Sequence, residues 1–408
     1  MQPHLRNHAP VPLLEPLNGE EEGAVKGWSP EEGRLLSRLE GLRLAHRVAK
    51  VAVLDAAGIR LAAVKLQAGN WETGEFSLRE LNRDAVHVLE TCFSPPTSCD
   101  HVDLWAAVPY NGPDGRYWHW PVFSVSCWRG NFARVVGNGL TPAELLASVS
   151  MVRYDPLFLQ HAVDGPLAQS RNFFAEPVPK LRPTVLTTSK SVEARAIVRG
   201  SPQDRTVAIT IDDGPNPIVT PLILHILHQA GVRATFFVVG EKIIQYPQLF
   251  LDIVSAGHEV GNHAFTDRRL VDLSLQEAAS ELVATSRLIE QMARIPCHLM
   301  RPPGGEIDAE KLALCARLGL TAVFWSKNTG DWQPKPASAI VSAALNNVRG
   351  GDIVLLHNGR PESALALREI VAALKQMGLQ PGRVSDLSPG AVIHSGSPDQ
   401  VVARLRAA

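Results

Sequence analysis

The sequence predicts an α/β protein, with a (β/α) barrel domain at the C-terminus preceded by a smaller α+β domain. Three observations predict it. The chain has 408 residues, and domains of roughly 100 to 200 residues make two the natural count. Prolines recur between residues 165 and 203 with little helical periodicity, which is typical of a linker. After the linker, short apolar strands alternate with amphipathic helices, as in parallel sheets.

Composition limits the classes of partner. Hydrophobic residues make up 45% and charged residues 20%, which is ordinary for a soluble globular protein. Lys and Arg number 40 against 41 Asp and Glu, so the chain lacks the basic field that binds nucleic acid or an anionic membrane. No apolar run approaches the roughly 20 residues that span a bilayer, and the sequence predicts no transmembrane segment. The first residues also lack a signal-peptide pattern, which favours a cytoplasmic or a processed protein.

Five cysteines without CxxC spacing predict buried or free thiols and no disulfide framework. Cys92 and Cys99 flank the short segment FSPPTS, and a bridge between them in an oxidising compartment is the alternative. The cysteines therefore do not decide the compartment.

The N-terminal half begins with a Pro- and Glu-rich stretch, predicted to be a loose arm over residues 1–28. Residues 29–164 are predicted to form the α+β domain. Helical spacing covers 29–44, two strands surround a turn at Ala57-Gly58, a helix covers 77–93, and two more strands cover 101–110 and 120–130. The sequence predicts no role for this domain.

The C-terminal half is predicted to be a barrel over residues 204–390, followed by a tail over 391–408. Helices are expected at 274–293 and 361–377. Six strands are expected at 206–211, 233–239, 258–263, 298–303, 321–326 and 352–358. In such barrels the active site lies at the carboxyl ends of the strands, so polar residues at these ends are the candidates.

The first strand ends in two adjacent aspartates, Asp212 and Asp213. A turn at Gly214-Pro215 brings both carboxylates to the mouth of the barrel, where one could bind a metal ion and the other accept a proton. The alternative is that both only cap the next helix.

His263 and Asp267 stand four residues apart, the spacing at which two side chains share one face of a helical turn. With Asp213 they would offer one nitrogen and two carboxylates, leaving positions for water and substrate as catalytic zinc sites do. A structural histidine is the alternative for His263.

Two further strand ends carry candidates. Arg301 precedes the rigid turn Pro302 to Gly305 and is expected to clamp Asp212, with a surface ion pair as the alternative. His357 ends the last strand, where it is either catalytic or only a strand-terminal histidine.

Five segments in this order and spacing, ITIDDGP, GNHAFTD, RPPGG, GDW and VLLH, resemble the motifs of the NodB-homology polysaccharide deacetylases, carbohydrate esterase family four. The resemblance covers about residues 196–390 and leaves the N-terminal domain unrecognised. It implies a distorted (β/α) barrel, in agreement with the strand and helix pattern.

The resemblance also implies roles for single residues. Asp212 matches the catalytic base, Arg301 the residue that orients it, Asp331 the group that tunes the catalytic histidine, and His357 the general acid. Asp213 and His263 match metal ligands. The substrate side is implied to include Trp332 as a groove wall, Leu355 at the acetyl-methyl pocket, and the Pro303-Gly304 turn, where the Gly304 N–H could donate to an oxyanion.

The chain departs from the family pattern H-[ST]-x-x-H, because Ala264 and Asp267 replace the hydroxyl residue and the second histidine. A carboxylate can ligate zinc, so Asp267 stays a candidate ligand. One divalent ion is expected, zinc first, with Co²⁺ or Mn²⁺ as alternatives because the extra carboxylate favours oxygen-loving ions. The added charge also predicts a lower rate or a higher pH optimum. Gly304 stands where an aromatic residue is common, a minor departure.

The sequence thus predicts a metal-dependent hydrolase that removes N-acetyl groups from a glycan, such as peptidoglycan, a chitin oligomer or an exopolysaccharide, and releases acetate. One alternative is an inactive barrel that binds glycan; another is a hydrolase of a different acyl or amide substrate. Family resemblance implies a cell-envelope or secreted protein, in contrast to the missing signal pattern. Oligomeric state is not predicted.

Overall fold

The computed structural model describes residues 30–56, 58–67, 77–111, 117–149, 153–154, 193–388 and 392–407. The chain divides into two compact units, an N-terminal and a C-terminal one. The arm predicted at 1–28 and most of the linker predicted at 165–203 lie outside the described residues. Among the helices that are described, none has the length and apolar character needed to cross a membrane.

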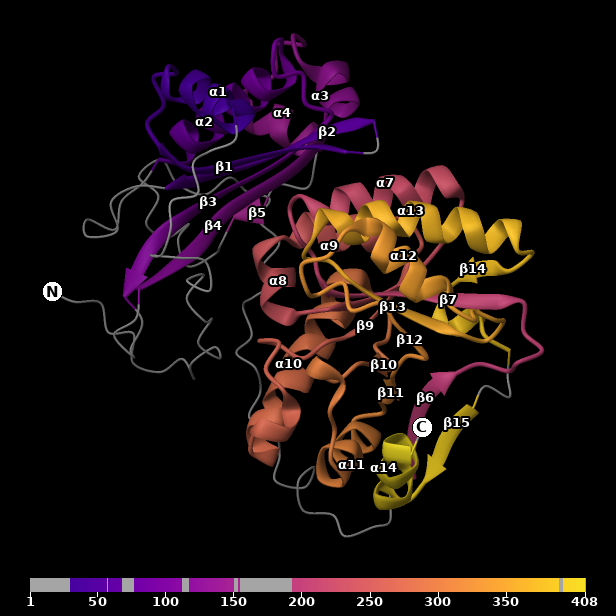
Figure 1. The fold of residues 1–408 in the computed structure, drawn as a ribbon. Helices are drawn as coiled ribbons and strands as arrows, with labels where there is room; N and C mark the ends of the chain where they lie inside the picture. The colour runs from indigo at the N-terminus through magenta and orange to yellow at the C-terminus, as the bar shows by residue number, and fades with distance from the viewer. Residues whose placement is uncertain are drawn as a thin grey trace, which may run out of the picture. The chain divides into compact units, whose positions relative to one another are not determined.

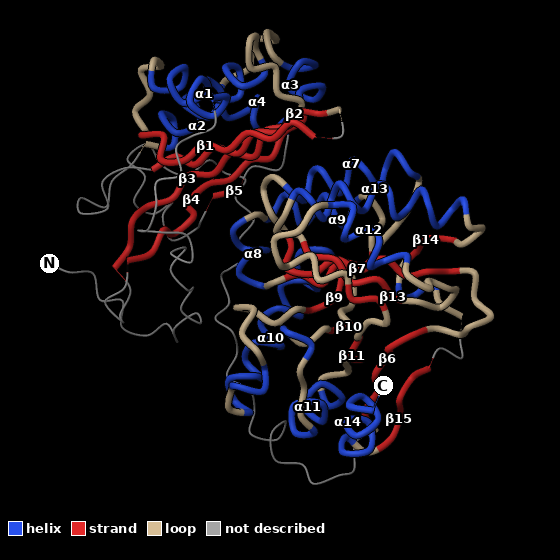
Figure 2. Tube along the Cα trace, in the orientation of Figure 1, coloured by secondary structure: helices blue, strands red, loops and turns tan. Residues whose placement is uncertain are grey.

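The N-terminal unit is a sheet of strand order β1-β2-β3-β4-β5. Four helices cover one face of this sheet (Figure 2). Pairing is antiparallel except between β2 and β3, which run parallel and are joined through α2. The elements are α1 (Pro30–Glu40), β1 (Arg47–Ala56), β2 (Ile59–Gln67), α2 (Leu78–Phe93), β3 (His101–Asn111), β4 (Tyr117–Trp128), α3 (Arg129–Val135), α4 (Pro142–Val149) and β5 (Arg153–Tyr154).

The core of this unit lies between the sheet and its helices, and Leu35, Val64, Leu89 and Phe123 are among its buried residues. The expected order of two strands, a helix and two strands is confirmed. Helices α3 and α4 and strand β5 were not predicted. All five cysteines of the chain are buried and free, so Cys92 and Cys99 form no bridge in this structure.

The C-terminal unit is a curled sheet with helices around it (Figure 1). Its strands are β6 (Ala194–Arg199), β7 (Thr206–Gly214), β8 (Thr235–Val238), β9 (Glu259–Asn262), β10 (Leu299–Met300), β11 (Thr321–Val323), β12 (Lys327–Asn328), β13 (Ile353–His357), β14 (Gln380–Gly382) and β15 (Val392–Gly396). Its helices are α7 (Val219–Ala230), α8 (Gly240–Gln245), α9 (Pro247–Ser255), α10 (Leu275–Ala293), α11 (Ala309–Arg317), α12 (Ala337–Leu345), α13 (Pro361–Gln376) and α14 (Pro398–Ala407). Short 3-10 turns cover Leu270–Asp272, Pro303–Gly305 and Val384–Asp386.

The strand order is β12-β13-β7-β8-β9-β10-β11-β6-β15, with β14 beside β7. Every pair is parallel except β6 with β15. The chain after β11 brings the two sides of the curled sheet together, because the Phe324 N–H donates to Ile197 of β6 and the Ser326 N–H donates to Ile353 of β13. A strongly bent parallel sheet of this kind is the distorted (β/α) barrel that the sequence predicts.

Two segments differ from the sequence expectation. Strand β6 lies within the range predicted to be a linker, and β15 with α14 lies within the predicted tail. Both strands are short, but β6 buries Ala194 and Ala196 in the sheet and β15 pairs along its edge. The surrounding prolines and polar residues hide such short strands in the sequence.

Candidate active site

The two aspartates of β7 reach the same edge of the sheet because the strand is irregular there. Its pairing with β8 shifts register between Ile211 and Gly214, and Asp213 takes a left-handed conformation with φ of 67°. This bulge, rather than the turn after Gly214 alone, turns both carboxylates toward the site. Asp212 is buried, whereas the side chain of Asp213 keeps 26% of its surface exposed.

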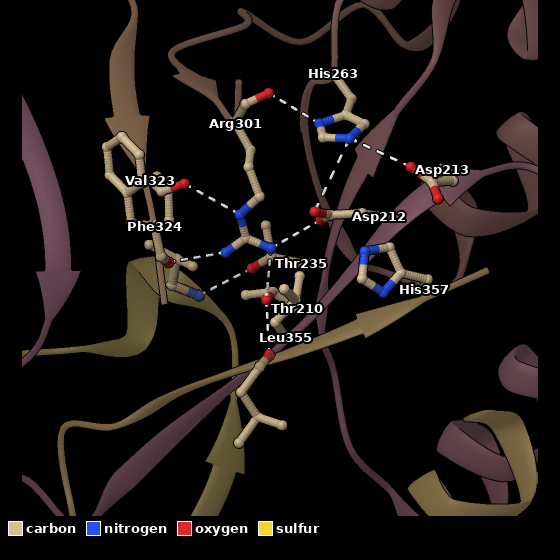
Figure 3. Close-up of polar contacts among 12 residues, drawn as sticks. Thr210, Asp212, Asp213, Thr235, His263, Arg301, Val323, Phe324, Leu355 and His357 are labelled. Atoms are coloured by element: carbon tan, nitrogen blue, oxygen red, sulfur yellow. Dashed lines mark hydrogen bonds and ion pairs between the residues drawn. The ribbon is translucent and has the colours of Figure 1, made fainter. Parts of the chain in front are cut away.

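Arg301 follows β10 and is completely buried, with its guanidinium held on every side (Figure 3). Its Nη1 lies 2.7 Å from Oδ1 of Asp212 and 2.8 Å from Oγ1 of Thr210. Its Nε and Nη2 donate to the Val323 and Phe324 carbonyls, both at 3.0 Å. The predicted Arg301–Asp212 clamp is present, and it is a buried pair rather than a surface one.

The ring of Phe237 lies 4.3 Å from the guanidinium carbon of Arg301. Thr210 accepts from Arg301 and donates its own proton to the Val354 carbonyl at 2.7 Å. Neither residue was predicted. Thr210 lies inside an apolar strand, so its link to Arg301 depends on strand order rather than on local pattern.

His263 follows β9 and presents one ring nitrogen to three carboxylates. Its Nδ1 lies 2.8 Å from the Arg301 carbonyl oxygen and donates to it, so Nε2 is the ring nitrogen that faces the carboxylates. Nε2 lies 3.3 Å from Asp213 Oδ1, 3.6 Å from Asp267 Oδ1 and 4.0 Å from Asp212 Oδ2.

Ligand atoms of Asp213, His263 and Asp267 all lie within 4.8 Å of one another. One neutral imidazole nitrogen with two carboxylate oxygens is a donor set that suits Zn²⁺, Co²⁺ or Mn²⁺. The residues present therefore fit a divalent ion, and Asp267 belongs to the cluster.

The reason expected for this closeness was wrong. Residues 263–267 form no helical turn, because they are a loop in which Ala264 and Asp267 both have φ of 60°. Asn262 accepts from the Ala264 N–H through its side-chain oxygen and donates to the Leu282 carbonyl of α10. The loop thus brings Asp267 back beside His263 through two left-handed residues.

The carboxylates around His263 favour a positive charge in this cluster. Burial by itself would lower the pKa of His263, but the charges of Asp212, Asp213 and Asp267 raise that pKa to about 9. Burial and the neighbouring charge of Asp213 raise the pKa of Asp267 to about 6. For Asp213, burial favours a higher pKa, but the contact with His263 lowers it below the usual range.

His357 ends β13 directly beside Asp212 of β7. Its Nδ1 lies 2.7 Å from Oδ1 of Asp331, and its backbone N–H donates to Oδ2 of Asp331 at 2.8 Å. Asp331 is fully buried, and Thr329 Oγ1 lies 3.0 Å from its Oδ1. Burial opposes charging of His357, yet Asp331 and the nearby Asp212 raise the pKa of the imidazole.

The predicted substrate-side residues lie close in sequence to these groups. Trp332 follows Asp331 and keeps 59% of its surface exposed, whereas Leu355 is buried in β13. Pro303 is buried, and Gly304 next to it has φ of 69°. Sequence reasoning missed Lys242, whose Nζ donates to the Asp213 carbonyl at 2.8 Å, and Thr329. Neither follows an apolar strand directly, so the strand-end rule does not find them.

Residues 199–323 match the polysaccharide deacetylase family. A chitooligosaccharide deacetylase of Bradyrhizobium sp. is 38% identical over 192 residues, covering 43% of this chain and 87% of that protein. A peptidoglycan-N-acetylglucosamine deacetylase of Bacillus cereus is 33% identical over 189 residues, covering 45% of this chain and 88% of that protein. Among solved structures, the family 4 carbohydrate esterase from Streptomyces lividans in complex with acetate is 33% identical, covers 46% of this chain and 96% of its own, and has a TM-score of 0.43.

Proposed function

This chain belongs to the polysaccharide deacetylase family, and we propose that its C-terminal unit hydrolyses N-acetyl groups on a glycan, releasing acetate and leaving a free amine. The observation that carries the proposal is that two sets of polar groups lie on either side of Asp212. A carboxylate clamped by a buried arginine stands between a cluster of metal-ligand type and a histidine–aspartate pair. The names of the two relatives support a glycan as substrate.

Asp213, His263 and Asp267 are the residues that would hold a divalent ion. When bound, such an ion supplies a Lewis acid that polarises the amide carbonyl and makes water more acidic. The His263 Nδ1 contact with the Arg301 carbonyl fixes the imidazole so that Nε2 faces both carboxylates. The two carboxylates make the cluster more anionic than one with a second histidine, which is why Co²⁺ and Mn²⁺ stay candidates beside Zn²⁺.

Asp212 takes the role of general base in this proposal. Its Oδ1 is bound by Arg301, whereas its Oδ2 faces the His263 side of the site. Arg301 holds the carboxylate in place through Oδ1, so Oδ2 can accept a proton from the attacking water. The four hydrogen bonds of the guanidinium leave Arg301 little freedom to move.

His357 takes the role of general acid. Asp331 holds Nδ1, which leaves Nε2 to donate its proton to the nitrogen of the leaving amine. The raised pKa keeps the imidazole protonated to higher pH than usual, as a proton donor requires. We assign the Gly304 N–H to the developing oxyanion, Leu355 and Pro303 to the acetyl pocket, and the exposed Trp332 ring to the sugar.

Replacement of the base tests this assignment. Asp212→Asn keeps an acceptor for Arg301 but removes the basic oxygen, so acetate release from N-acetylglucosamine oligomers should fall by about 10²–10⁴-fold. Zinc affinity should stay near that of the wild type, whereas Asp213→Asn should lose zinc. Wild-type turnover in D212N would remove Asp212 from the mechanism.

A further inference from the structure

The loop that carries Asp267 has a shape that local preference does not favour. Ala264 and Asp267 both adopt left-handed backbone conformations, which are unfavourable for residues with a Cβ atom such as alanine. Asp267 also faces the carboxylate of Asp213 across the cluster and keeps 40% of its side chain exposed. The left-handed residues and the repulsion between the Asp213 and Asp267 carboxylates both favour a loop conformation in which Asp267 lies farther from the cluster. Contacts from other elements must therefore hold the loop in place.

One buried carboxylate on α10 makes three contacts with this loop. Oε2 of Glu281 accepts from the N–H groups of Phe265 at 2.8 Å and Thr266 at 2.7 Å. Oε1 of Glu281 lies 2.9 Å from the Thr266 hydroxyl, which donates to it. Glu281 is only 6% exposed, and bonds from N–H and O–H donors to a charged carboxylate are among the stronger hydrogen bonds.

The opposite side of the loop is held by α8. The N–H groups of Gly240 and Glu241 donate to the carbonyls of Ala264 and Phe265, both at 3.0 Å. These contacts end at Phe265, whereas Glu281 also binds Thr266, the residue immediately before Asp267. Glu281 is therefore the anchor nearest to the proposed ligand.

We infer that Glu281 is a positioning residue that holds the 263–267 loop in the strained shape that presents Asp267 to the metal cluster. The inference rests on the proposed function, because it assumes that Asp213, His263 and Asp267 bind an ion. Glu281 acts through geometry: its carboxylate contacts the loop backbone and does not ligate.

Two substitutions separate geometry from charge. Glu281→Asp keeps the charge but withdraws the carboxylate by one methylene, so the loop contacts are lost. Glu281→Gln removes the charge but keeps the length, because the amide oxygen can accept from both N–H groups while the amide nitrogen donates to the Thr266 hydroxyl. Glu290→Asp is the matched control, since Glu290 lies on the same helix with an exposed side chain.

The test measures Zn²⁺ affinity by competition with a chromogenic chelator, and the thermal midpoint with excess chelator reports stability separately. E281D should weaken zinc binding by about 10–100-fold, the usual effect of losing a residue that supports a ligand. E290D should bind as the wild type does, E281Q should lose less affinity than E281D because it keeps the contacts but not the charge, and Thr266→Val, which removes one of the three contacts, should fall between the wild type and E281D.

Wild-type zinc affinity in both E281D and T266V would overturn the inference, as would a loss in E281Q equal to or larger than that in E281D. Failure of the proposed metal site looks different, because the wild-type protein itself would then bind no zinc.

Discussion

At the scale of single residues, Arg301 joins three strands through one buried guanidinium. It contacts Asp212 and Thr210 on β7 and the carbonyls at and after the end of β11, while its own carbonyl fixes His263. Arg301 therefore supports the proposed base through its side chain and the proposed metal ligand His263 through its backbone carbonyl. A change at Arg301 should affect folding as well as catalysis.

Arg301→Met should lower the free energy of unfolding by about 3–5 kcal/mol, because it leaves the buried Asp212 carboxylate without its partner. Urea denaturation in the presence of chelator measures this without a contribution from metal. Arg269→Met is the control, since Arg269 is about half exposed and its ion pair with Glu306 should contribute little. Equal losses in the two variants would contradict the account.

Asp331 should set the alkaline limit of activity through His357. Asp331→Asn keeps an acceptor for Nδ1 but removes the charge that raises the pKa of His357. His357, the proposed general acid, should then lose its proton at lower pH, so the alkaline limb of the kcat/KM profile should move to lower pH. Asp272→Asn, a change at an exposed carboxylate, should leave the profile in place. An unmoved limb in D331N would show that Asp331 does not tune the acid.

Most of the candidate residues could be predicted because each stands at the end of an apolar strand. Asp212 lies near the end of β7, His263 and Arg301 directly follow β9 and β10, and His357 ends β13. Thr210 and Glu281 could not be found by this rule, since one lies within a strand and the other within a helix. A charged residue at Glu281, on the buried face of an amphipathic helix, was nonetheless a signal in the sequence.

At the scale of elements, α10 is important because it carries Glu281 and because its Leu282 carbonyl accepts a hydrogen bond from the Asn262 side chain. Its start is a capping box: the Ser274 hydroxyl accepts from the Glu277 N–H, and the Glu277 carboxylate accepts from the Ser274 N–H at 2.9 Å. Such a box satisfies two backbone donors at the end of the helix.

Ser274→Ala should therefore cost about 1 kcal/mol of stability. The zinc affinity should hardly change, because the cap lies about two turns from Glu281. Ser280→Ala, inside the same helix, should be neutral or slightly stabilising, since alanine is the best helix former. Urea denaturation of both variants measures the difference, and equal stability would show that the cap contributes nothing.

Long elements with a clear period were predictable, including α10, α13 and the core strands β7 and β13. Strands β5, β12 and β14, of two or three residues each, were not, because so short a run has no period. Strand β6 was missed for another reason: its buried residues are alanines, which give a weak apolar signal between arginines.

At the scale of the whole molecule, the parallel order of the strands brings the site residues together at one edge of the sheet. The residues come from β7, β9, β10 and β13 and the segment after β12, yet all lie at carboxyl ends that a curled parallel sheet brings together. The sequence predicted this gathering but not its details. The contacts of the segment after β11 with β6 and β13, and the bulge at Asp213, depend on strand register, which no local pattern reveals.

We propose metal-dependent deacetylation at the Asp213-His263-Asp267 cluster. The most direct measurement is acetate release from N-acetylglucosamine oligomers by the purified protein, first after chelation and then after separate addition of Zn²⁺, Co²⁺ or Mn²⁺. Chelation should abolish release, at least one ion should restore it, and no ion should restore it in D212N. Absence of release with every ion would rule out deacetylation of these oligomers, and release that persists after chelation would rule out metal dependence.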